Sequence, residues 1–239
     1  MNTFPPARRL TARNVLAALG WWSVVVPVTA LGLWLAAGFP ASEPWWPDRT
    51  VLAWAAGQRN GPLDTGLAAI TWAGSLYLLG PLAGLVLVSL LWRGRGCDGL
   101  LLALGLGGAA LLSNFLKAFI DRDRPAIYEP LIALPADGAF PSGHAIQAAA
   151  FALALFLLAR RRGWRRLPWL ATALVLMVGA VGLSRVYLQV HYPTDVIAGL
   201  VLGVGWVLGL EQLTPGLGPP PDGQSREVTL TVRSGTREG

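Results

Sequence analysis

The sequence predicts an all-α, polytopic membrane protein in which six transmembrane helices form one bundle. Of the 239 residues, 54% are hydrophobic and only 13% are charged, whereas a soluble domain usually carries about 25% charged residues. The charges are also clustered, which leaves long charge-free windows, and a membrane-spanning helix needs roughly 20 mostly apolar residues. Helices are favoured because backbone groups in a bilayer must be hydrogen-bonded internally. A soluble bundle is the alternative, but these helices leave too little polar sequence to coat one.

The charge-free windows locate the helices. They cover residues 14–42, 65–92, 99–116, 138–159, 167–184 and 196–210. From these windows we expect transmembrane helices at about 15–38, 67–92, 98–119, 144–160, 168–185 and 194–213. A cleaved signal peptide is an alternative for the first helix, but its apolar run exceeds the usual 7–15 residues of such peptides.

The segments outside these spans have distinct expected structures. Segment 44–63 is too polar to span, and we predict a short surface helix around Thr50–Ala56. We divide the chain into a cytoplasmic segment 1–14, a membrane domain 15–213 and a disordered cytoplasmic tail 214–239. The tail is rich in Pro and Gly, and its alternating stretch Glu227–Val232 has no partner strand. We see no repeat of 20–50 residues, which argues against a repeat-built transporter.

Basic residues predict the orientation. With the N-terminus inside, most of the 19 Lys and Arg residues fall on cytoplasmic segments, as the positive-inside rule requires. The six that remain outside are Arg49, Arg59, Lys117, Arg122, Arg124 and Arg185. The net charge of +6 is therefore a topology signal, and no basic face on a soluble element indicates a nucleic-acid partner. The single cysteine excludes a disulfide scaffold and a cysteine-ligated zinc site.

Three polar clusters lie on the predicted outer side, each next to a helix end. The first runs from Lys117 to Arg124-Pro125, the second is Pro141-Ser142-Gly143-His144, and the third runs from Ser184-Arg185 through His191 to Asp195. Both histidines of the chain fall in these clusters. Ionisable residues at such positions in a membrane protein usually face a cavity and mark function.

The residue types in these clusters suit phosphoryl transfer. Lys117, Arg124 and Arg185 supply three positive charges for an anion with several oxygens. Ser142 and Gly143 read as the N-terminus of a helix, where free backbone N–H groups bind anions. Asp195 is placed to fix the tautomer of His191, although Pro193 argues against a regular helix between them. His144 is left as a general acid.

Less specific interpretations exist for each cluster taken alone. A histidine in an outer loop is often simply solvated, and arginines near helix ends often extend to lipid head groups. Asp121 and Asp123 offer a metal site as an alternative, although without a dense cluster of ligands we interpret them as solvated carboxylates that balance Arg122. The convergence of all three clusters on one face favours a catalytic site.

Together the clusters resemble the signature of the type 2 phosphatidic acid phosphatase superfamily, which also includes vanadium-dependent haloperoxidases. That signature is Lys-x6-Arg-Pro, Pro-Ser-Gly-His and Ser-Arg-x5-His-x3-Asp, and the chain matches it in residue type and spacing. The resemblance covers residues 98–213. It implies a six-helix membrane phosphatase with its active site at the extracytoplasmic membrane face.

The resemblance also implies a role for each motif residue. His191 would attack phosphorus and form a phosphohistidine, Asp195 would orient His191, and His144 would protonate the leaving oxygen. The phosphoryl oxygens would be held by Lys117, Arg124, Ser142, Gly143 and Arg185. No metal and no cofactor are expected, because the three cations take the place that Mg²⁺ has in other phosphoryl-transfer enzymes.

The sequence leaves substrate and assembly open. Phosphatidic acid, phosphatidylglycerophosphate and polyprenyl diphosphate all fit a site at the membrane surface, so the expected partners are a lipid phosphate and membrane lipids. A transporter or scramblase that binds such lipids without hydrolysis is the alternative, and the scarcity of polar residues inside the spans weakens it. A haloperoxidase is disfavoured because those enzymes are soluble as a rule. The Arg-, Ala- and Gly-rich composition suggests the inner membrane of a bacterium, and the oligomeric state is not readable.

Overall fold

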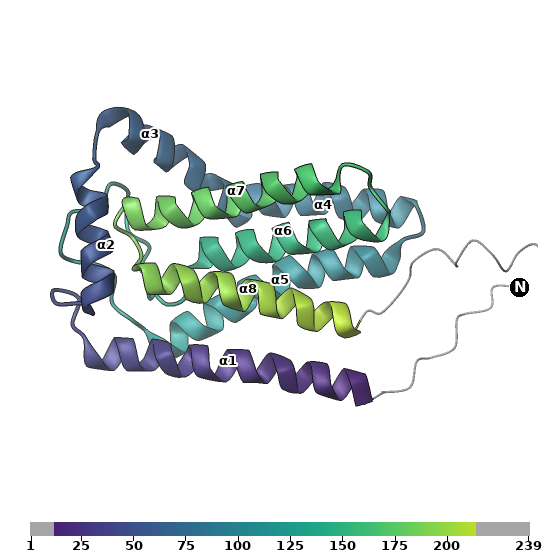
Figure 1. Cartoon of the computed structure of the whole chain (residues 1–239), viewed down its shortest axis with the longest axis horizontal. Coiled ribbons are helices and arrows are strands. Elements are labelled where there is room, and N and C mark those ends of the chain that lie inside the picture. The colour runs from purple at the N-terminus through teal and green to yellow at the C-terminus, as the bar shows by residue number, and fades with distance from the viewer. Residues whose placement is uncertain (1–11, 214–239) are drawn as a thin grey trace, which may run out of the picture.

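The structure is a bundle of long helices with a short helix lying across one end (Figure 1). The computed structural model describes residues 12–213, and all regular structure in that range is helical. The long helices are α1 (Ala12–Gly38), α4 (Leu76–Trp92), α5 (Gly96–Ile120), α6 (Gly143–Arg161), α7 (Leu167–Tyr187) and α8 (Pro193–Leu213). The shorter elements are α2 (Trp46–Gly57), α3 (Gly61–Ile70) and the 3-10 helix η1 (Thr71–Gly74). The predictions for segments 1–11 and 214–239, the tail included, fall outside the described residues.

The predicted membrane spans are confirmed, with one change. Within residues 12–213, five helices, namely α1, α5, α6, α7 and α8, are long and apolar enough to cross a membrane. The sixth predicted span, 67–92, is not one helix, because Gly61–Gly74 and Leu76–Trp92 meet at a bend of 42°. Ser75 makes the break: its backbone is extended, and its Oγ accepts a hydrogen bond from the N–H of Tyr77, so it caps a new helix, α4.

Helix α6 occupies the centre of the bundle and packs against α5, α7 and α8. Its many alanines are buried, and they leave room for the neighbouring helices to approach closely. The closest approach is to α8, where Gly199 and Gly203 face the first turns of α6. A Cβ atom at Gly199 would lie 2.7 Å from the carbonyl oxygen of Ser142, and one at Gly203 would lie 2.5 Å from that of Ile146. These two glycines therefore let α8 press against the start of α6.

Helix α1 closes one side of the bundle against α8. Trp21 packs edge-on against Trp206 with ring centroids 5.5 Å apart, and Gly205 leaves space for the Trp21 ring. At its other end, Gly32 makes room for the ring of Phe140 from the loop between α5 and α6.

The predicted short surface helix is confirmed as α2, which runs across one end of the bundle (Figure 1). This end of the bundle also contains the last turns of α1, α5 and α7 and the first turns of α6 and α8. We call this the site end. The first residue of α1 and the last of α8 lie at the opposite end, as Figure 1 shows. The three polar clusters predicted from the sequence all meet at the site end.

Candidate active site

The three sequence motifs reach the site end from different helices. Lys117 lies in the last turn of α5, and Arg124 follows in the loop after it. Ser142 occupies the N-cap position of α6, with Gly143 and His144 in the first turn. Arg185 lies in the last turn of α7, and Asp195 lies in the first turn of α8. His191 stands in the short connection between these two helices. The fold thus brings every predicted site residue to one end of the bundle.

His191 is the centre of the site, with its two ring nitrogens in different surroundings. Nε2 lies 3.4 Å from Nη1 of Arg124. Nδ1 lies 3.5 Å from Oδ2 of Asp195, an ion-pair distance that is longer than a good hydrogen bond, and Nδ1 has no hydrogen-bond partner among the described residues. Because a guanidinium only donates and a carboxylate only accepts, this arrangement favours the tautomer with its proton on Nδ1. The lone pair on Nε2 then faces the cation side of the site.

The electrostatics of the site keep His191 neutral. Burial lowers the pKa of His191 well below its usual 6.5, and the charges of Arg185, Arg124 and Lys117 lower it further. A neutral imidazole is a nucleophile, whereas the imidazolium is not. The same three cations that are suited to bind an anion therefore also keep the histidine in its reactive form.

Asp195 is held in place by several groups. Its Oδ2 accepts a hydrogen bond from the N–H of Tyr192 at 2.9 Å, and its Oδ1 accepts one from Nη1 of Arg122 at 2.6 Å. The expectation that Pro193 prevents a regular helix through residues 191–193 is confirmed, because α8 begins at that proline, where a missing N–H costs nothing. His191 precedes the helix, and Asp195 reaches back to it from the first turn.

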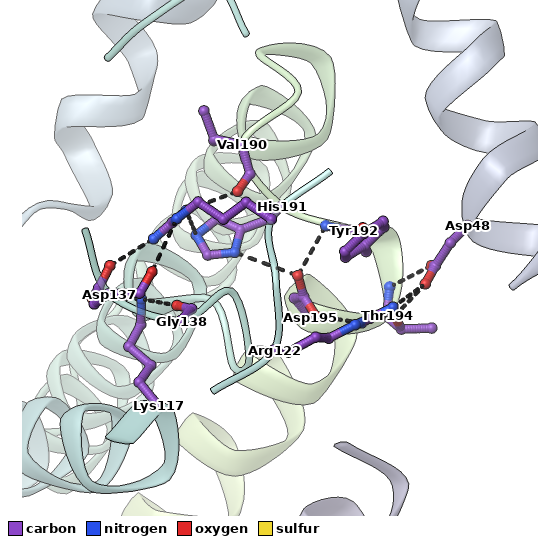
Figure 2. A network of polar contacts seen from close by, with 11 residues as sticks. Asp48, Lys117, Arg122, Asp137, Gly138, Val190, His191, Tyr192, Thr194 and Asp195 are labelled. Atoms are coloured by element: carbon purple, nitrogen blue, oxygen red, sulfur yellow. Dashed lines mark hydrogen bonds and ion pairs between the residues drawn. The ribbon is translucent and has the colours of Figure 1, made fainter. Parts of the chain in front are cut away.

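The second part of the site is a pair of cations at the end of α5. Lys117 is buried, and its Nζ donates to Oδ2 of Asp137 and to the carbonyl of Gly138, both at 2.8 Å. Arg124 donates to Oδ1 of Asp137 at 2.7 Å and to the carbonyl of Val190 at 2.8 Å. Figure 2 shows Lys117 and Asp137 on one side of His191 and Asp195 with Arg122 on the other.

The third predicted cation, Arg185, is buried and anchored at one end only. Its Nη1 donates to Oγ1 of Thr71 in η1 at 2.7 Å, while its Nε has no partner among the residues that the structure describes. The Oγ of Ser142 is likewise buried and unpartnered within residues 12–213. Ser142 occupies the predicted N-cap position, but its side chain makes no capping hydrogen bond. Both groups therefore retain donors for a ligand.

Gly143 keeps the start of α6 open beside the cation pair. A Cβ atom there would lie 3.8 Å from Cε of Lys117 and 3.5 Å from Oγ of Ser113, with no severe clash. The glycine is therefore not required by packing. A side chain at this position would instead lie beside the lysine, on the approach to the backbone N–H groups of the helix N-terminus.

The interpretation of Arg122 from the sequence is wrong. Asp121 and Asp123 were expected to balance its charge, but the guanidinium is buried and donates to Asp195 and to Oδ2 of Asp48, at 2.6 and 3.1 Å. It also stacks on the ring of Tyr192, 4.0 Å from the centroid. Asp48 comes from α2, far away in the sequence, so spacing within the motif gave no sign of the contact.

Two further acidic residues were missed by the sequence analysis. Asp48 accepts hydrogen bonds from the backbone N–H and the hydroxyl of Thr194, at 3.0 and 2.6 Å, and so ties α2 to the start of α8. Asp137 bridges Lys117 and Arg124. Neither residue belongs to a recognisable motif. The only signal available was that each carboxylate lies in a segment between two predicted spans, on the side of the membrane where the three motifs were expected.

Comparison with known proteins identifies the family. The PAP2 superfamily profile matches residues 98–217. Phosphatidylglycerophosphatase B of Bacillus subtilis is 34% identical over 59% of this chain and 70% of its own length. The lipid A 1-phosphatase of Rhizobium etli is 39% identical over 41% of this chain and 42% of its own length.

The fold is shared as well. The crystal structure described as the first transmembrane PAP2 type phosphatidylglycerolphosphate phosphatase from Bacillus subtilis superposes with a TM-score of 0.67 at 26% identity. The match covers 85% of this chain and 96% of that one. The resemblance inferred from the motifs is therefore confirmed: this chain belongs to the PAP2 superfamily, as a multi-pass membrane phosphatase.

Proposed function

We propose that this protein hydrolyses a lipid phosphate at the site end of the bundle, through a phosphohistidine intermediate and without a metal ion. The observation that carries the proposal is the setting of His191, whose Nδ1 lies toward Asp195 while Nε2 faces the cations. This is the geometry that an imidazole nucleophile needs, since Nδ1 is oriented by the carboxylate and the lone pair of Nε2 faces the cations proposed to bind the phosphoryl group.

The reaction has two chemical steps. In the first, the lone pair of His191 Nε2 attacks phosphorus and the bond from phosphorus to the leaving oxygen breaks. His144, which carries a proton once the bound anion has offset the charge of the cations, gives that proton to the leaving oxygen. Lys117, Arg124 and Arg185 bind the phosphoryl oxygens and neutralise the charge that spreads over them. The buried hydroxyl of Ser142 and the N–H of Gly143 supply further donors.

The second step releases the product. Water attacks the phosphohistidine, His144 now accepts the proton from that water, and orthophosphate leaves with regeneration of neutral His191. Asp195 stabilises the Nδ1 proton in both steps, and its own position is fixed by Arg122 and Tyr192. No step requires a metal, because the three cations supply positive charge where phosphorus reacts.

The proposed substrate class is a lipid with a terminal phosphate or diphosphate. Lys117 and Arg185 lie in the last turns of helices that are apolar enough to span a membrane, so the site lies near the level of lipid head groups. Phosphatidic acid, phosphatidylglycerophosphate and polyprenyl diphosphate all present such a group there. The names of the relatives, a phosphatidylglycerophosphatase and a lipid A 1-phosphatase, support this class.

Phosphate release by the purified protein tests the proposal. We expect detergent-solubilised protein to release orthophosphate from at least one of these lipids in excess chelator, and we expect His191→Ala to abolish turnover. Substrate labelled with ³²P should leave an acid-labile, base-stable label on the protein, absent from the variant. Loss of activity with the chelator would contradict metal independence, and no release from any lipid would favour the binding or transport alternative.

The role of His144 can be tested separately through the leaving group. Protonation matters for an alcohol leaving group but little for nitrophenolate, because nitrophenolate leaves without a proton. His144→Asn should therefore slow hydrolysis of the lipid by about 10²–10⁴-fold. With p-nitrophenyl phosphate it should still show a burst of nitrophenol before slow turnover. An equal loss on both substrates, with no burst, would contradict the assignment of His144 as general acid.

A further inference from the structure

Asp137 belongs to none of the three motifs, yet its carboxylate lies between two of the proposed phosphate ligands. Its Oδ2 accepts from Nζ of Lys117 at 2.8 Å, and its Oδ1 accepts from Nη2 of Arg124 at 2.7 Å. Each carboxylate oxygen thus takes one cation. Two oxygens of a phosphoryl group would bind these cations in the same manner, because carboxylate and phosphate are both bidentate acceptors.

The backbone of the Asp137 loop is anchored independently of the carboxylate. Lys117 also donates to the carbonyl of Gly138 at 2.8 Å, and Arg124 Nε donates to the carbonyl of Asp137 at 3.2 Å. The N–H of Ala139 donates to the carbonyl of Arg122 at 2.7 Å. These three hydrogen bonds keep the loop against the end of α5 when the Asp137 carboxylate dissociates from Lys117 and Arg124. The side chain is free to move, since it is 47% exposed, whereas both cations are 8% exposed.

Charge makes the carboxylate and a phosphoryl group mutually exclusive on this pair. Burial alone would raise the pKa of Asp137, but its hydrogen bonds and ion pairs with Lys117 and Arg124 lower the pKa below the usual value. Asp137 is therefore ionised at neutral pH. A phosphate dianion bound to the same two cations would meet a negative charge at contact distance.

We propose that in the free enzyme the Asp137 carboxylate occupies the place of the phosphoryl oxygens on Lys117 and Arg124, and that substrate displaces it. This inference rests on the proposed function, which assigns the two cations to phosphate binding. Asp137 then sets the strength of phosphoryl binding. Because any anion must displace the carboxylate, Asp137 lowers the affinity of the site for every anion. A dianion displaces the carboxylate more readily than a singly charged group does. When orthophosphate leaves, the carboxylate binds Lys117 and Arg124 again.

Binding of orthophosphate tests the proposal, with Asp137→Asn as the variant. The amide keeps the shape of the side chain but removes the charge that competes with the ligand. We expect the dissociation constant for orthophosphate to fall roughly three- to tenfold, which is the effect of removing one or two partly exposed ion pairs. The KM for a lipid phosphate should fall as well, and inhibition by the orthophosphate product should become stronger. Asp137→Glu keeps a carboxylate in reach and should bind orthophosphate as weakly as the unchanged protein.

Asp123→Asn is the matched control, since Asp123 is an exposed carboxylate in the same loop. It should leave the affinity for orthophosphate unchanged, which separates the loss of a specific contact from a change in local net charge. If instead Asp137 only holds Lys117 and Arg124 in position, Asp137→Asn will bind orthophosphate more weakly than the unchanged protein. That result, or equal binding, would overturn the proposal.

The binding measurement does not depend on turnover. Calorimetric titration of the detergent-solubilised protein with orthophosphate compares the variants even when no lipid is hydrolysed. Tighter binding to Asp137→Asn without lipid hydrolysis would support the displacement while contradicting the proposed function. If the unchanged protein hydrolyses a lipid phosphate but Asp137→Asn binds orthophosphate equally or more weakly, the proposed function is supported and the displacement is contradicted.

Discussion

At the scale of single residues, the surroundings of His191, the proposed nucleophile, favour the neutral imidazole. The imidazole is buried and surrounded by fixed cations, so both desolvation and charge lower its pKa. The same cations are neutralised when an anion binds, so the environment of His191 becomes less positive as the phosphoryl group arrives. In the proposed mechanism, binding of the phosphoryl group and activation of His191 therefore depend on the same three side chains.

We propose that Arg122 and Asp48 position Asp195 and do not themselves contact the substrate. Arg122 is bonded to both carboxylates, and Asp48 is bonded to Arg122 and to Thr194, one residue before Asp195. These contacts leave Asp195 little freedom to turn away from His191. A buried pair of this kind costs desolvation, so its value lies in orientation more than in stability.

Asp48→Asn tests this positioning role. The amide weakens the hold on Arg122 and Thr194, so Asp195 loses part of its orientation, and a small displacement at a catalytic group is costly. We expect kcat to fall roughly tenfold to a hundredfold, with a much smaller change in KM, because no phosphate ligand is altered. Steady-state kinetics on a lipid phosphate gives both values.

The opposite end of the bundle offers a matched control. Asp98 is also buried, and it pairs with Arg95 and Arg161 away from the site. Asp98→Asn should lower the melting temperature by an amount similar to Asp48→Asn but leave kcat unchanged. If both variants lose kcat in proportion to stability, the role of Asp48 is only structural.

At the scale of elements, the contact between α6 and α8 sets the position of the start of α6, where we propose that the phosphoryl group binds. The N–H of Ser142 donates to the carbonyl of Asp195 at 3.0 Å, and Gly199 allows the two backbones to approach this closely. The oxyanion donors of α6 and the carboxylate of α8 are thereby placed relative to each other. Small residues at four-residue spacing are a frequent solution for close helix contacts in membranes.

Gly199→Ala should therefore impair both stability and activity. A Cβ would lie 2.7 Å from the Ser142 carbonyl, so α6 and α8 must separate, at a cost of about 1–3 kcal/mol for overpacking. Melting temperature and kcat should both fall. Gly107→Ala in α5 is the control, since a Cβ there meets nothing within 4 Å. Equal behaviour of the two variants would show that the close contact does not matter.

The broken span is the element that sequence analysis described least well. Window 65–92 carries no charge, so composition indicated one helix. The break serves tertiary contacts: Gly74 lies against the backbone of His144, and Thr71 binds Arg185. The sequence contains Gly74-Ser75 at the break, but such pairs also occur inside continuous helices. What makes the break stable is the partner side chains on α6 and α7, which no local pattern reveals.

At the scale of the whole molecule, both described ends of the chain lie opposite the site end (Figure 1). Arg93, Arg95, Arg160, Arg161 and Arg162 lie in the helix ends and turns of that same opposite end. The positive-inside rule then predicts that the opposite end is cytoplasmic and that the site faces the outside. This orientation remains a prediction.

The single cysteine provides the measurement of orientation. Cys97 is exposed at the start of α5, at the end opposite the site. A membrane-impermeant maleimide should label it only after the cells are permeabilised. With Cys97 replaced by Ser, a cysteine introduced at the exposed Ala126 of the site end should be labelled in intact cells. The reverse pattern would place the site in the cytoplasm and contradict the predicted topology.

The sequence by itself determined five of the six apolar spans, the surface helix α2 and the motif residues that meet at the site end. These features are local, because helix length follows from apolar runs and each motif lies within a dozen residues. The tertiary structure decided the contacts between segments: the bend at Ser75, the link from Arg122 to Asp48 and the placement of Asp137 on Lys117 and Arg124. An ion pair depends on where two distant segments are packed together, and apolar runs fix which segments form the long helices but not which charged residues meet.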